Sequence, residues 1–141
     1  MSSVVVGYDG SEGSRASLDR AIDLAAELGD SVDVVFGYAP PGIFGGEIAD
    51  HAEAVKERGS KALEEAEHQA AAKGGEVEVR TTLVARRATE ALLEAAEDSG
   101  ARMIVVGNHG APSPLRGAIL GSVPYKLVHL SPIPVLVVPA G

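Results

Sequence analysis

Five short apolar runs alternate with four segments of helical periodicity along this chain of 141 residues. Short runs rich in valine, isoleucine and leucine and bounded by turn residues predict strands. The predicted strands cover residues 3–8, 31–38, 76–84, 102–106 and 132–139. Strands and helices that alternate in this way predict an α/β fold, a doubly wound parallel sheet with right-handed crossovers and helices on both faces.

The helical segments carry apolar residues at steps of three and four, which places those residues on one helix face. In the first segment Leu18, Ile22 and Ala25 form such a face, and Gly29 ends the helix. A chain of this length fits one domain, residues 1–141. The other helices are predicted at residues 47–73, 86–99 and 122–130, the first of these with an inner face of Ala52, Val55, Ala62, Ala66 and Ala70.

Composition and charge exclude several classes of protein. The chain has no cysteine, which excludes disulfides, thiol catalysis and zinc sites with cysteine ligands. Its formal charge of −8 repels polyanions, so we expect a protein that binds neither nucleic acid in general nor anionic membranes. No apolar run approaches the roughly 20 residues that span a bilayer. Residues 1–8 lack a basic region followed by a long apolar segment, so no signal peptide and a cytoplasmic location are expected.

The stretch 105–122, VVGNHGAPSPLRGAILGS, combines a strand end, a glycine-rich loop and the start of a helix. Glycines let a backbone approach a polyanion closely and turn its N–H groups toward it. A helix N-terminus adds unpaired N–H groups and a partial positive charge. Ser122 is placed to cap the helix and to offer a hydroxyl to a phosphate oxygen. The stretch predicts a phosphate-binding loop, and the alternative is a crossover loop that binds nothing.

Two common nucleotide-binding loops are excluded by the letters of the sequence. No Gly-x-x-x-x-Gly-Lys-Ser/Thr occurs, so the chain has no P-loop lysine. The first strand is followed by Gly7-Tyr8-Asp9-Gly10, which lacks the Gly-x-Gly-x-x-Gly spacing of a dinucleotide fingerprint.

A different glycine pattern resembles the universal stress proteins of the UspA type. ATP-binding members of that family carry Gly-x2-Gly-x9-Gly-Ser/Thr after the fourth strand, and the two ends of this pattern match Gly107 with Gly110 and Gly121 with Ser122. The spacer, residues 111–120, is one residue longer and contains two prolines. VVGYDGSEGS and IPVLVVP also resemble the first and last strands of the family, so the resemblance covers essentially the whole chain.

The resemblance implies a strand order of 3-2-1-4-5, in which the order reverses between the first and fourth strands. Ligands of such sheets bind beyond the carboxyl ends of the strands at this point. Asp9 and the loop 107–122 follow those two strands. Asp9 matches the family residue that contacts the adenine or ribose end of the nucleotide, and the alternative role is a cap for the following helix.

Other site residues are also assigned through the resemblance. Val106 and Val123 match positions that line the nucleotide, with ordinary core packing as the alternative. His109 matches a position near the phosphates, and the alternative is a structural or solvated histidine. Arg116 is the only cation inside the loop and is a candidate phosphate partner, unless it is simply solvated.

Two positions depart from the family pattern. Nucleotide-binding members tend to have an apolar residue, often valine, against the adenine where this chain has Gly37. A glycine there predicts a thinner wall at the base. Members also often have a glycine and a proline before the third helix, where this chain has Ala85-Arg86-Arg87-Ala88, so this turn must be built differently.

The residues provide no convincing set for fast catalysis, which needs a nucleophile or a positioned base together with charge stabilisation. The function implied by the resemblance is therefore regulatory: a homodimer, paired through its last strand, that binds ATP or another adenylate such as AMP, with Mg²⁺ as a companion of ATP. The alternatives are a dimeric scaffold for protein interactions that binds no nucleotide, and an enzyme that hydrolyses ATP slowly.

Overall fold

The computed structural model describes residues 2–39, 45–108 and 120–140, and the side chains of the long second helix from residue 53 onward. In these residues strands and helices alternate along the chain, as predicted. The elements are β1 (Ser3–Gly7), α1 (Glu12–Leu28), β2 (Ser31–Gly37), α2 (Gly45–Lys73), β3 (Val79–Val84), α3 (Ala88–Ser99), β4 (Met103–Gly107), α4 (Ser122–Leu130) and β5 (Val135–Val138).

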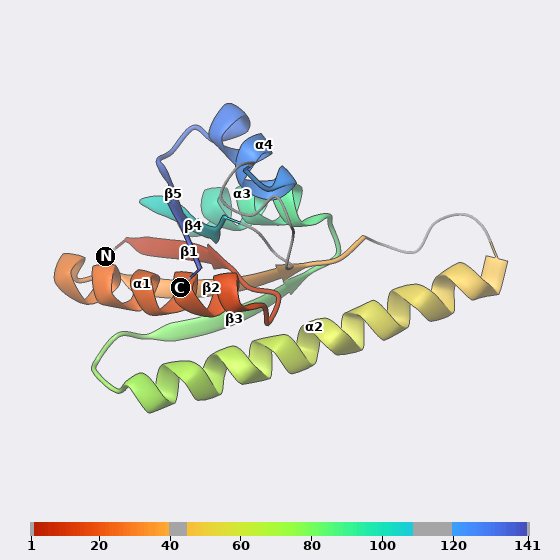
Figure 1. Cartoon of the computed structure of the whole chain (residues 1–141), viewed down its shortest axis with the longest axis horizontal. Coiled ribbons are helices and arrows are strands. Elements are labelled where there is room, and N and C mark those ends of the chain that lie inside the picture. Colours follow the sequence, from red (N-terminus) through yellow and green to blue (C-terminus); the bar gives the residue numbers. More distant parts are fainter. Residues whose placement is uncertain (1, 40–44, 109–119, 141) are drawn as a thin grey trace.

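The five strands form one parallel sheet in the order β3-β2-β1-β4-β5. Helices α1 and α2 cover one face, and α3 and α4 cover the other (Figure 1). The predicted doubly wound α/β fold and its strand order are confirmed. In the resulting sheet the order reverses between β1 and β4, so that the carboxyl ends of these strands diverge into loops on opposite faces.

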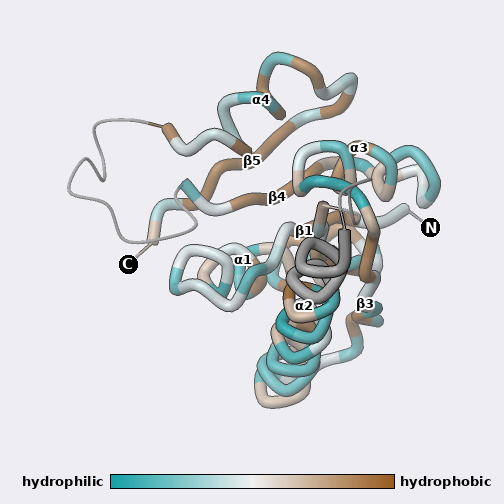
Figure 2. The backbone as a smooth tube through the Cα atoms, turned by 90° about the vertical axis from the view of Figure 1, so that its right-hand side faces the viewer, coloured by the Kyte–Doolittle hydropathy of each residue, from teal (hydrophilic) through white to brown (hydrophobic). Residues whose placement is uncertain are grey.

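The core consists of two apolar layers, one on each side of the sheet. Alternate residues of β1 supply both, since Val4 and Val6 pack against α1 and α2 while Val5 packs under α3. All three valines are fully buried. Figure 2 shows hydrophobic residues along β4 and β5 and mainly hydrophilic residues on the outer turns of α2. A central strand buried on both faces explains the continuous apolar run at the start of the sequence.

Several predicted boundaries differ from the observed ones. The strand predicted at 76–84 begins only at Val79, because Gly74 and Gly75 adopt positive φ values of 74° and 94° and prolong the turn after α2. The strand predicted at 132–139 is shortened to Val135–Val138. Its flanking prolines lack the N–H that a longer ladder would need.

Helix α2 is longer than the sheet that it covers, and its N-terminal part extends beyond the body of the domain (Figure 1). From residue 53 onward, its buried residues begin at Gly59 and continue through Ala62, Leu63 and Ala66. Of the predicted inner face, Ala62 and Ala66 are buried, Val55 and Ala70 are half-buried, and Ala52 lies outside the described side chains. None of the described helices is both long enough and apolar enough to cross a membrane.

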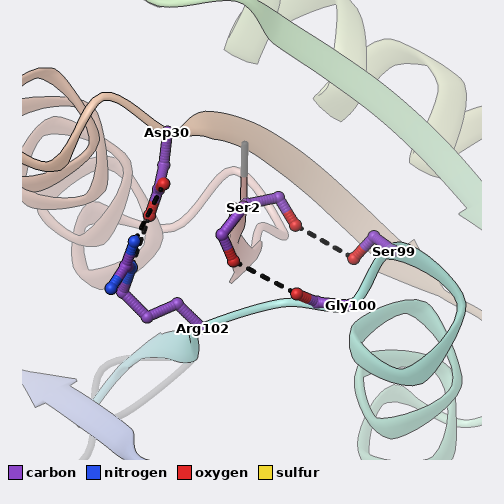
Figure 3. A network of polar contacts seen from close by, with 6 residues as sticks. Ser2, Asp30, Ser99, Gly100 and Arg102 are labelled. Carbon is purple, nitrogen blue, oxygen red and sulfur yellow. Dashed lines mark hydrogen bonds and ion pairs between the residues drawn. The ribbon is translucent and has the colours of Figure 1, made fainter.

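A polar network joins the amino ends of the three central strands (Figure 3). Arg102, just before β4, pairs with Asp30, just before β2, through Nε–Oδ2 and Nη2–Oδ1 distances of 2.7 and 3.3 Å. The Ser2 hydroxyl donates to the carbonyl of Gly100 at 3.2 Å, and the hydroxyls of Ser3 and Ser99 bond at 3.0 Å. These contacts hold the end of the sheet that is opposite the predicted site.

Candidate functional site

A cavity of about 280 Å³ opens at the carboxyl ends of β1, β2 and β4, where the strand order reverses. Its volume is close to the lower limit of ordinary small-molecule sites, which is about 300 Å³. Three strand ends and the N-terminal turns of α3 and α4 enclose it. The lining comprises residues 7–9, 35–37, 106–107 and 121–124. Ser11 and Ser14 at the start of α1 and Ala88 and Leu92 of α3 complete it.

The cavity brings together most of the residues that the sequence singled out. Seven of them line it although they come from four separate parts of the chain: Asp9, Gly37, Val106, Gly107, Gly121, Ser122 and Val123. His109, Gly110 and Arg116 lie outside the described residues. The role of these residues in holding a ligand stays a prediction.

Asp9 lies at the mouth of the cavity and is exposed. Its Oδ1 accepts the backbone N–H of Ser11 at 2.9 Å, which is an Asx turn. The cap of α1 is instead Ser11, whose hydroxyl accepts the N–H of Ser14 at 3.2 Å. The Asx turn fixes the carboxylate and leaves its second oxygen without a partner among the described residues. Asp9 can therefore shape the turn and accept a hydrogen bond from a ligand hydroxyl or amine.

Gly107 ends β4 where the strand passes very close to the first turn of α1. A Cβ at this position would lie 3.0 Å from the carbonyl carbon of Gly13 and 3.1 Å from its oxygen. Only glycine fits between these two backbones without a shift. The structural reason for Gly107 is thus the approach of β4 to α1, which closes one side of the cavity.

The N-terminus of α4 borders the cavity through Gly121, Ser122 and Val123. Gly121 is the N-cap, and no side chain caps the helix. The prediction that Ser122 caps α4 was wrong, because the extended backbone of the cap (φ −60°, ψ 162°) lies one residue earlier. Ser122 is exposed in the first turn, so its hydroxyl is available to a ligand. The N–H of Gly121 donates to the carbonyl of Asn108 at 3.0 Å, which ties the two ends of the glycine-rich loop together.

Gly37, at the end of β2, lies against the first turn of α3. A Cβ there would lie 2.7 Å from the Cβ of Ala91 and 2.7 Å from the carbonyl oxygen of Arg86. The expectation of a thinner wall at this position was therefore wrong, because α3 occupies the space that a larger side chain would fill. Ala88 and Leu92 of that helix line the cavity beside Gly37.

The turn between β3 and α3 is built on the backbone. The carbonyl of Val84 accepts N–H groups from both Arg86, at 2.9 Å, and Tyr38, at 3.0 Å. The first of these closes a three-residue turn of the γ type. Arg87 then caps α3 through its backbone only, and no side chain binds the free N–H groups of the first turn. A second uncapped helix N-terminus therefore borders the cavity at Ala88.

Tyr8 connects the cavity to α1 and α2. Its hydroxyl donates to Oε1 of Gln69 at 3.3 Å, and Nε2 of Gln69 donates to the carbonyl of Arg15 and to Oδ1 of Asp19 at 2.8 and 2.9 Å. Burial, followed by the nearby carboxylate of Glu65, raises the pKa of Tyr8. The phenol is therefore neutral at physiological pH and acts as a hydrogen-bond donor.

Sequence reasoning missed several residues that line the cavity, namely Tyr8, Val35, Phe36, Ala88, Leu92 and Pro124. Tyr8, Val35 and Phe36 could have been found, because they lie toward the carboxyl ends of the first two predicted strands, next to the point where the strand order reverses. Ala88 and Leu92 carried no such signal, since their place depends on how α3 packs. The described residues contain no group of three or more His, Asp or Glu side chains that could hold a metal ion.

Comparison with known proteins gives the family. A model of the "Universal stress protein family" matches residues 1–139. The universal stress protein YxiE of Bacillus subtilis is 33% identical, with 96% of this chain and 97% of YxiE covered. Among solved structures, a universal stress protein in complex with cAMP is 30% identical, with a TM-score of 0.74 and coverage of 99% and 98% of the two chains. A universal stress protein from Archaeoglobus fulgidus in complex with dAMP has the same fold, with a TM-score of 0.70, 21% identity and 98% of each chain covered. The chain belongs to the universal stress protein family.

Proposed function

We propose that this protein binds an adenine nucleotide in the cavity at the ends of β1, β2 and β4, and that it acts as a regulatory protein without fast catalysis. The observation that carries the proposal is the composition of this one cavity, in which two uncapped helix N-termini and the fixed carboxylate of Asp9 surround a partly apolar space. Family members that are similar to this chain bind cAMP and dAMP, which supports an adenylate as the ligand.

The cavity offers a different chemistry to each part of a nucleotide. Val35, Gly37 and Leu92 form an apolar end for the base. Asp9 lines the same cavity and can accept a hydrogen bond from a ribose hydroxyl. The N-terminal turn of α4 with the hydroxyl of Ser122 is the place for a phosphate, because helix N-termini stabilise anions. ATP and AMP share all three parts, and Mg²⁺ would accompany ATP on its phosphates.

Calorimetric titration with adenosine, AMP, cAMP and ATP tests this assignment, with ATP measured in the presence and absence of Mg²⁺. We expect binding of the nucleotides by the wild-type protein. Ser122→Ala should weaken binding of AMP and ATP by about tenfold, the effect of one hydrogen bond to a charged group. It should leave adenosine unaffected. Ser131→Ala is the control, because Ser131 follows the opposite end of α4 and bonds locally to Ile133.

If the wild-type protein gives neither heat nor a thermal shift with millimolar adenylates, the nucleotide proposal fails and a dimeric interaction scaffold is the remaining function. Analysis of the products formed during long incubation with ATP separates binding from slow hydrolysis. Appearance of ADP at a rate that depends on Asp9 would instead favour an enzyme.

The proposed regulatory form is a homodimer that pairs through β5. This strand is at the edge of the sheet, and its residues Val135–Val138 are only half-buried in the single chain. An apolar edge strand of this kind is a site of association unless it is covered. Helix α4 packs beside β5 and carries three exposed large apolar residues, Tyr125, Val128 and Leu130.

A further inference from the structure

The carboxyl end of β2 is held between two helices that approach it unusually closely. On one face, a Cβ on Gly37 would lie 2.7 Å from two atoms of the α3 region, the Cβ of Ala91 and the carbonyl oxygen of Arg86. On the other face, a Cβ on Gly59 of α2 would lie 2.6 Å from the ring of Phe36. Adjacent residues of one strand end are thus packed against α3 and α2, and each contact depends on a glycine. Phe36 and Gly37 both line the cavity.

The contact at Gly37 is the more rigid of the two. Ordinary van der Waals contact of a Cβ begins at about 3.4 Å, and the Cα of Ala88 is a third neighbour at 3.0 Å. Two of the three atoms belong to backbone, so no single side chain can rotate away. The carbonyl of Val84 also anchors the turn by accepting the N–H groups of Arg86 and Tyr38. A side chain at position 37 would therefore have to push the start of α3 away from the sheet.

The start of α3 forms the cavity wall beside the strand end. Ala88 and Leu92 lie one helical turn apart on the side of α3 that lines the cavity, and Leu92 is 2% exposed. A Cβ on Gly7 at the end of β1 would lie 3.2 Å from Cδ1 of Leu92, so the leucine also fits closely against β1. The distance between this wall and the strand ends sets the width of the apolar end of the cavity.

We propose that Gly37 is the positioning residue of the base site: by lacking a side chain it admits α3, and Ala88 and Leu92 then form the wall against which a planar adenine packs. This inference rests on the proposed nucleotide binding and adds how the base is recognised. In this chain a helix provides the contact that a larger residue on β2 would otherwise make. A flat aromatic base requires a slot of constant width, and a shift of half an ångström would remove much of the dispersion contact.

The test compares adenosine, AMP and ATP binding to Gly37→Ala and to the wild-type protein by calorimetry. The variant should bind all three ligands about tenfold more weakly or worse, because they share the base. This pattern differs from that of Ser122→Ala, which should spare adenosine. Ala25→Gly is the control for lost stability, because Ala25 is fully buried in α1 and does not line the cavity. At a similar fall in Tm it should keep each Kd within about twofold of wild type.

Two further variants keep the inference testable if Gly37→Ala fails to fold. Ala91→Gly, added to Gly37→Ala, removes one of the two closest contacts of the new Cβ and should recover part of the lost affinity for adenosine. Ala88→Leu leaves Gly37 unchanged but extends a side chain from α3 into the base end, and it should abolish adenosine binding. If Gly37→Ala or Ala88→Leu binds adenosine as tightly as wild type, the inference is wrong while the proposed function stands. If wild type binds no adenylate, both are wrong.

Discussion

Asp30, just before β2, and Asp33, within β2, show that two neighbouring buried carboxylates can have opposite effects on stability. Asp30 is 5% exposed, and the hydrogen bonds from Arg102 hold its pKa below the usual value (Figure 3). Asp33 is 8% exposed and accepts one hydrogen bond, from the hydroxyl of Thr82 at 2.8 Å. Burial outweighs this bond and raises the pKa of Asp33. The folded state therefore favours the charged form of Asp30 and the neutral form of Asp33.

Asp30→Asn should destabilise the protein at pH 7 by about 1–2 kcal/mol, because a hydrogen-bonded ion pair becomes a neutral contact. A depressed pKa in the folded state means that the stabilisation is complete above the pKa of the unfolded chain and is lost as the pH falls through the folded value. Urea unfolding at pH 7 and at about pH 2 measures this. The difference in the free energy of unfolding between variant and wild type should shrink at the lower pH. A constant difference would show that the ionised form of Asp30 does not provide the stabilisation.

Asp33→Asn should have the opposite effect on stability. It should stabilise the protein at pH 7 by about 1 kcal/mol, at the lower end of the cost of burying a polar group. Because folding raises the pKa of Asp33, the wild-type protein loses stability as the pH rises from the unfolded to the folded value. The amide carries no charge and still accepts the hydrogen bond from Thr82. The urea midpoints of the wild-type protein and of Asp33→Asn, measured from pH 3 to pH 7, should diverge with rising pH. Equal midpoints at pH 7 would show that the charge of Asp33 is well solvated.

The sequence predicted each strand and helix but not every end. Gly29 ends α1 with a φ value of 73°, as the sequence suggested, because glycine adopts this conformation without steric cost, and Gly100 ends α3 in the same way with a φ value of 62°. The predicted N-cap of α4 was wrong by one residue, since the hydrogen bond from the N–H of Gly121 to the carbonyl of Asn108 fixes the backbone there. Such ends depend on contacts with distant parts of the chain, which no local pattern contains.

Helix packing explains a glycine that local propensity does not. Alanine is favoured over glycine inside a helix by about 1 kcal/mol. In α2, however, a Cβ on Gly59 would lie 2.6 Å from Cδ1 of Phe36 and 2.8 Å from Cδ1 of Leu83. Gly59→Ala should therefore lower stability by about 1–3 kcal/mol, the usual cost of overpacking. Thermal unfolding measures the change, with exposed Ser60→Ala as the neighbouring control. A higher Tm for Gly59→Ala would mean that α2 yields easily at this point.

The cavity that forms the candidate site could be located from the sequence because strand order determines where the strand ends meet. Asp9, Val106 and Gly121 are far apart in the chain, yet the order 3-2-1-4-5 brings them to one cavity. The order itself came from the resemblance to the family, since apolar periodicity does not specify which strands are neighbours. The width of the cavity could not be predicted, because it depends on how closely α3 approaches Gly37.

The edge strand β5 pairs with β4 on one side only. The carbonyl of Pro134 accepts the N–H of Ile104 in β4 at 3.0 Å, and the carbonyl of Val138 accepts the N–H of Asn108, just after β4, at 3.1 Å. Alternate residues of a parallel strand face the same neighbour, so the backbone of Val137 faces away from the sheet. Val137→Pro would remove one outward N–H and leave the bonds to β4 in place.

If two copies pair through β5, Val137→Pro should convert the dimer to a monomer in light scattering measured over a range of concentrations. Val137→Ala trims the side chain but keeps the N–H, so it should remain mainly dimeric. A dimer that survives the proline would show that the apolar surface of α4, including Tyr125, Val128 and Leu130, joins the two copies without strand pairing. A wild-type monomer would remove the assembly proposal and leave nucleotide binding as a property of the single chain.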